Sequence, residues 1–170
     1  MYRKHAALVG IVFAALSTLV GCSPDDPPPP STEPAHSCVA GSELAPPADG
    51  MTTVIAGIGS GAGFAELADD DDVEREYGAQ GGNHVTLTVR LFVAENESWI
   101  YDLSLLSSDD VVYQEASVGA TACPGGWVES TNLRLLTHDV PSDSTAKLRV
   151  VARRDGSAAS ATFERTIVIH

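Results

Sequence analysis

Four consecutive aspartates give the sequence its densest negative charge, and Glu74 and Glu76 follow closely. Calcium is bound by about six to eight oxygen atoms, several of them from carboxylates on one tight loop. The residue types therefore suit a weak extracellular calcium site. The run lacks the spaced Asp-x-Asp-x-Asp-Gly pattern of a calcium loop, and a solvated β-turn is the other interpretation. The candidate calcium ligands are Asp69, Asp70, Asp71 and Asp72.

Histidines are the other potential metal ligands, because imidazole suits zinc and copper. His84 begins an alternating stretch in which it shares the polar face with Thr86, so we expect its side chain to lie outside the core. A blue-copper site needs histidine and methionine close behind a cysteine, whereas Cys123 is followed by Pro-Gly-Gly-Trp. Calcium or transition-metal binding, through the aspartates or His84, is the alternative function. The histidines beyond the first 21 residues are His36, His84, His138 and His170.

The glycine-rich stretch 54–63 matches a G-x-G-x-x-A dinucleotide fingerprint at Gly57, Gly59 and Ala62. Such a site needs a helix whose N-terminus meets the pyrophosphate inside a βαβ unit. Residues 64–68 leave barely one turn before the aspartates. The sequence therefore favours a glycine-rich connection between strands, and we expect no cofactor.

Hydrolase signatures are missing from the sequence. It contains neither Gly-x-Ser-x-Gly nor His-Glu-x-x-His, and no carboxylate pair has a spacing typical of acid–base catalysis. We therefore expect a protein that is not an enzyme.

The N-terminus has the three parts of a secretory signal peptide: Arg3 and Lys4, an apolar run from Ala6 to Val20, and the small residue Gly21. The run is shorter than the about 20 residues of a membrane span. Its end, Leu-Val-Gly-Cys, resembles the bacterial lipobox. This resemblance implies that residues 1–21 are removed and that the thiol of Cys22 carries lipid.

The resemblance also implies where the protein lies. Each buried methylene of an acyl chain contributes about 0.8 kcal/mol, and two chains anchor a protein far better than one. In Gram-negative sorting an aspartate after the lipidated cysteine favours the inner membrane, whereas this chain has Ser23. We therefore expect a lipid anchor in the cell envelope, at the outer membrane. The expected partners are the membrane, through Cys22, and an envelope or surface protein or glycan.

If Cys22 carries lipid, Cys38 and Cys123 are the remaining thiols. A disulfide between them is the default in an oxidising compartment, and two free thiols are the alternative. The bond would close a loop of about 85 residues, which stabilises the fold by about 4 kcal/mol in the chain-entropy model. No two cysteines have CxxC spacing, which excludes a metal site of that kind.

The sequence is strongly acidic, with a formal net charge of −13. Removing Arg3 and Lys4 with the leader makes the charge −15. A chain of this charge repels nucleic acid and anionic membrane surfaces, so we expect no nucleic-acid partner. Cationic partners and divalent metals are compatible with it.

Residues 22–48 follow the signal peptide 1–21 as a stiff, proline-rich linker that begins at the lipidated cysteine. Residues 49–170 change to a period of two, which is typical of half-buried strands. The longest such stretch is 84–93, and 99–105 is similar. Stretches 147–153 and 162–169 flank Asp155-Gly156 and predict a hairpin. Shorter predicted strands are 52–56, 73–77, 110–116 and 133–137.

This pattern predicts an all-β fold, an antiparallel β-sandwich that is loosely Ig-like. The segment 58–92, with its glycine-rich start, acidic turn and Gln-Gly-Gly-Asn-His sequence, resembles uncharacterised lipoproteins of myxobacteria and their relatives. That resemblance covers about a third of the chain. It implies a tethered β-sandwich and assigns no functional residue. We expect a non-enzymatic envelope lipoprotein whose sandwich binds another envelope component.

Overall fold

The computed structural model describes residues 35–39, 44–78, 82–94, 98–121, 123, 125–154 and 156–170. The chain divides into two units, residues 1–31 and 32–170, and all described residues belong to the second. The predicted signal peptide, Cys22 and most of the predicted linker lie outside the described residues. Within those ranges, no helix has the length and apolar character needed to cross a membrane.

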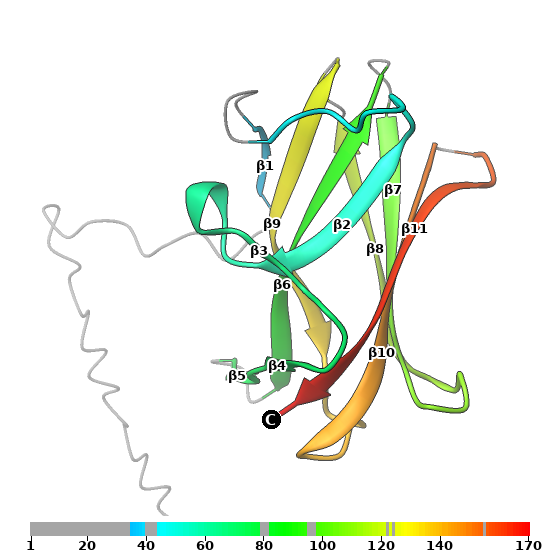
Figure 1. Ribbon diagram of the computed structural model, residues 1–170. Helices are drawn as coiled ribbons and strands as arrows, with labels where there is room; N and C mark the ends of the chain where they lie inside the picture. Colours follow the sequence, from blue (N-terminus) through cyan, green and yellow to red (C-terminus); the bar gives the residue numbers. More distant parts are fainter. Residues whose placement is uncertain are drawn as a thin grey trace, which may run out of the picture. The chain divides into compact units, whose positions relative to one another are not determined.

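Two β-sheets pack face to face in the second unit (Figure 1). Sheet A contains, in spatial order, β1 (Ala35–Cys38), β9 (Gly126–Leu136), β6 (Asn83–Val93), β2 (Thr53–Ile58) and β3 (Ala65–Glu66), and β5 (Glu76–Tyr77) also pairs with β6. Sheet B contains β4 (Asp71–Val73), β11 (Ala159–Ile169), β10 (Ser144–Arg154), β7 (Ser98–Leu106) and β8 (Val112–Thr121). Among the described strands, β4 and β11 pair in parallel and every other pair is antiparallel. The predicted all-β sandwich is confirmed.

The core lies between the sheets and follows the predicted alternation. On β6, the inward side chains from Val85 to Leu91 are fully buried. On β7, Trp99, Tyr101 and Leu105 lie opposite them in the same cluster. Burying alternate aliphatic and aromatic side chains is the main force that holds such sheets together, at about 25 cal/mol per Å² of apolar surface.

The predicted C-terminal hairpin is also present. β10 and β11 pair from Ser144 opposite Ile169 to Arg153 opposite Ala159. The backbone N–H of Ser157 donates to the carbonyl of Arg154, and Gly156 has a φ of 74°. That left-handed conformation suits glycine. Asp155, the other predicted turn residue, lies outside the described residues.

Three shorter strands differ from their predicted bounds. The stretch 73–77 is two strands, because β4 ends at buried Val73 in sheet B while β5 pairs with β6 in sheet A. β8 begins at Val112, after a turn in which Asp110 donates to Ser107. β9 extends back to Gly126, since Glu129 and Ser130 are polar but buried and interrupt the apolar pattern.

β1 lies within the range 22–48 that the sequence analysis assigns to the linker. Its four residues pair antiparallel with β9, from Ala35 opposite Thr131 to Cys38 opposite Val128. All four are exposed. The domain's first strand therefore precedes residue 49, the predicted start of the sandwich.

The outer face of β6 is buried, although the alternation predicted a polar, exposed face. Thr88 and Arg90 are both about 4% exposed. The connection between β2 and β3 covers them, and the hydroxyl of Thr88 donates to the carbonyl of Gly59 at 2.5 Å. The alternation in the sequence indicates which face of a strand is apolar. It does not indicate whether a loop folds back and covers the polar face.

Candidate functional site

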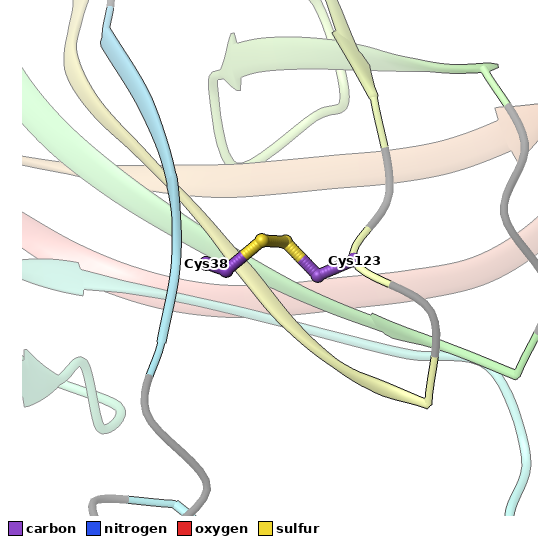
Figure 2. The surroundings of a disulfide bond; sticks show 2 residues. All are labelled: Cys38 and Cys123. Atoms are coloured by element: carbon purple, nitrogen blue, oxygen red, sulfur yellow. A yellow bond between two sulfur atoms is a disulfide. The ribbon is translucent and has the colours of Figure 1, made fainter.

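The disulfide joins Cys38, at the end of β1, to Cys123, in the connection between β8 and β9 (Figure 2). The two Cα atoms are 5.7 Å apart, within the usual range for a disulfide. The predicted pairing is therefore confirmed. Because β1 is short and exposed, this bond fastens an edge strand that backbone hydrogen bonds alone would hold weakly.

A hollow of about 540 Å³ opens beside the disulfide-fastened strand. It lies where β1 of sheet A approaches β7 and β8 of sheet B, and its lining is mainly apolar. His36 borders it from β1 and Trp99 from β7. Val118 and its neighbours in β8 form the remaining wall.

A chain of hydrogen-bonded side chains joins the two sheets next to this hollow. The Nδ1 atom of His36 lies 2.7 Å from the Oγ atom of Ser130. The Ser130 hydroxyl donates to the phenolic oxygen of Tyr101 at 3.4 Å. Desolvation lowers the pKa of His36, and burial raises the pKa of Tyr101 to about 12, outweighing the opposite effect of the Ser130 hydrogen bond.

A serine beside a histidine raises the question of nucleophilic catalysis. Ser130 has no exposed surface, so a substrate in the hollow does not reach its oxygen. A nucleophile needs access to the reacting atom and a base held in place by a third group. The arrangement of Ser130, His36 and Tyr101 fits a polar link between sheets. Its three members come from three strands with no sequence motif, so sequence analysis missed them.

A buried ion pair lies on the outer face of sheet A. The Arg90 Nη2 atom is 2.7 Å from the Oε2 atom of Glu129, and both side chains are 5% exposed. The Gly61 N–H donates to the same carboxylate at 3.0 Å, and Nη2 of Arg90 donates to the Gly61 carbonyl at 2.7 Å. The guanidinium also lies over the Phe64 ring, 4.2 Å from its centroid. These contacts hold the glycine-rich connection against the sheet.

The glycine-rich stretch is a strand connection, as the sequence predicts. A 3₁₀ turn at Gly61–Gly63 stands where a dinucleotide site needs a helix. A Cβ at Gly57 would lie 2.2 Å from the carbonyl oxygen of Ala65, which leaves no space for a side chain. Gly59 has a φ of +78°, which also favours glycine. The glycines therefore serve the close approach of this connection to the sheet.

Three of the four aspartate side chains make hydrogen bonds to different partners. Asp69 accepts from the N–H of Thr166 at 2.9 Å, and Asp71 accepts from the N–H of Ala68 at 2.8 Å. Asp72 lies 2.8 Å from the Nε2 atom of His170. Across the described ranges, no three His, Cys, Asp or Glu side chains come together in a group that could hold a metal ion. The calcium hypothesis for Asp69–Asp72 stays a prediction.

His84 is buried although it is not part of the hydrophobic core. Its side chain is buried, with 5% of the residue exposed, where β5 pairs antiparallel with the start of β6 and Glu76 lies opposite His84. Its Nε2 atom lies 3.5 Å from the carboxylate of Glu76, on β5. His84 lies outside the hydrophobic cluster, as the sequence predicts, but pairing with β5 buries it. The other histidines pair separately, His138 with Asp139 and His170 with Asp72 and Asp143.

Comparison with known proteins identifies no family. No family model matches the sequence, and no curated protein matches it. Among solved structures, the N-terminal domain of PorA is similar, with 12% sequence identity and a TM-score of 0.35. The match covers 68% of this chain and 96% of that domain. At this TM-score the similarity carries no argument about function.

The candidate site is therefore the hollow and the edge of β8 beside it. The site has an apolar wall and a strand edge, and the side chains of His36, Ser98, Ser117 and Thr121 also line it. Sequence analysis recognised part of β8 as a strand. It could not show that β8 is an edge, because strand order depends on long-range pairing.

Proposed function

We propose that this protein is a non-enzymatic cell-envelope lipoprotein, anchored by lipid on Cys22 at the outer membrane. Its β-sandwich domain binds another component of the envelope or surface, either a protein or a glycan. The disulfide between Cys38 and Cys123 is the observation that best supports this proposal. Structural disulfides persist in exported proteins, and this pairing leaves Cys22 as the thiol available for lipid.

The described part of the domain supports binding rather than catalysis. Ser130 in the histidine–serine link is fully buried, and the buried ion pair holds a loop against the sheet. A hollow with an apolar lining beside a strand edge is a surface on which a partner can bury apolar atoms.

Anchoring is tested with Cys22→Ser. Lipidation needs the thiol, so we expect labelled palmitate to enter the wild-type protein and not the variant. The variant should also be uncut or wrongly cut and should leave the membrane fraction. A wild-type protein that takes up no label would refute the lipoprotein assignment, whatever the sandwich binds.

A further inference from the structure

β8 is the end strand of sheet B, and among the described strands it pairs only with β7. Its free edge can therefore pair with an added strand. Natural edge strands are often protected by lysine, proline or a bulge. Residues 112–121 contain no Lys, Arg or Pro, and the one register shift is at the Val112 end. From Gln114 to Thr121 the strand is regular.

The hollow opens along this same edge. Residues 117–121 of β8 all line it, although alternate residues of a strand point to opposite faces. Residues 98–100 of the neighbouring β7 line it too, so the hollow reaches across this end of the two paired strands. A strand added to β8 would direct alternate side chains along Val118 and Ala120, beside the almost fully buried Trp99 of β7, and these form an apolar wall. The hollow's volume of about 540 Å³ accommodates aliphatic side chains there.

The charge around β8 favours a basic occupant. β8 and the turn before it carry three carboxylates, Asp109, Asp110 and Glu115, and no Lys or Arg. Lys147 and Arg149 both reach Asp110, at 2.5 and 3.8 Å, whereas Glu115 is exposed on the strand. The whole chain has a formal net charge of −13. Like charges across an interface are costly, so a second copy of this chain is disfavoured and a cationic segment is attracted.

We propose that the β8 edge binds an extended, basic segment of a partner protein. The segment extends sheet B by one strand; its apolar side chains enter the hollow, and Lys or Arg residues alternate with them. Backbone hydrogen bonds supply affinity in this mode, and the side-chain hollow supplies specificity. The inference rests on the proposed binding function and names the surface and partner class.

The test variant is Gly119→Lys, which adds a cation to the proposed edge. Gly119 is exposed on β8, its φ is not left-handed, and a Cβ there meets no atom within 4 Å. The matched control is Gly63→Lys. Gly63 is also exposed with free space around its Cβ, but it lies in the glycine-rich connection of sheet A. Both variants change the net charge equally.

The probe is a fluorescent peptide of about nine alternating lysines and valines, a typical strand length. Its binding to the full-length protein in detergent is measured by anisotropy. We expect wild type and Gly63→Lys to bind alike and Gly119→Lys to bind at least tenfold more weakly, which is about 1.4 kcal/mol. A glutamate–valine peptide should not bind. Hydrogen exchange should slow in residues 114–121 when the lysine–valine peptide is added.

Four results would overturn the edge proposal: no binding of the lysine–valine peptide, equal binding by Gly119→Lys, slowed exchange elsewhere, or self-association of the wild type through residues 114–121. A second experiment separates failure of the edge proposal from failure of the proposed binding function. The immobilised protein is used to capture its partners from envelope extract. If wild type and Gly119→Lys capture the same component equally, the domain binds through another surface. If neither captures any component, the binding function itself is refuted.

Discussion

Arg90 and Glu129 form a buried ion pair on the outer, polar face of sheet A. Their charges are buried and paired, and they share hydrogen bonds with Gly61. Removing one member of a buried ion pair leaves the other charge uncompensated, at a typical cost of about 3 kcal/mol. We expect Glu129→Gln to lower the free energy of unfolding by about that amount, measured by urea denaturation.

The double variant Arg90→Met with Glu129→Gln is the control for that prediction, because it removes both charges together. Its loss of stability should be smaller than the sum of the two single losses. Strictly additive losses would show that the two side chains do not act as a pair.

His170 makes stability depend on pH, because its ring bridges two carboxylates. Hydrogen bonds to Asp72 and Asp143 raise its pKa above the ordinary 6.5. A raised pKa in the folded state means that the stabilisation is fully present below pH 6.5 and is lost as the pH rises through the folded pKa. We expect the melting temperature to fall over that interval, and His170→Gln to remove this fall.

His36 should change the pH dependence of stability in the opposite direction from His170, because desolvation lowers its pKa. Its contribution has the opposite sign, and stability is lost as the pH falls below 6.5 through the folded pKa.

For the His170 prediction, a His170→Gln protein that still loses stability as the pH rises would show that other groups cause the effect.

At the scale of elements, β1 depends on the disulfide. The strand has four exposed residues, and its sequence neighbours at 40–43 lie outside the described residues. Replacing both Cys38 and Cys123 with serine removes the constraint on a loop of about 85 residues, which costs about 4 kcal/mol in the chain-entropy model. We expect a lower melting temperature and faster hydrogen exchange in 35–38 than in β6. Unchanged exchange in 35–38 would mean that pairing with β9 alone holds the strand.

At this scale of elements, some strands were predicted correctly from the sequence and others were not. Strands 84–93, 99–105 and the hairpin were predicted because apolar and polar residues alternate along them, and the structure confirms these strands. The stretch 73–77 was predicted as one strand and is two, because its ends belong to different sheets. β9 was predicted too short, since buried Glu129 interrupts its apolar pattern.

At the scale of the whole molecule, the sequence by itself determined the fold class and the strand alternation, and it predicted the cysteine pairing on the condition that Cys22 carries lipid. Those features follow from local periodicity and from the number of available thiols. Only the tertiary structure decided that β8 is an edge, that His84 is buried, and that His36, Ser130 and Tyr101 form a link between the sheets. Each of these depends on which distant strands pair and which loops cover them. A period of two specifies the two faces of a strand, and the strand's neighbours come from contacts that are remote in sequence.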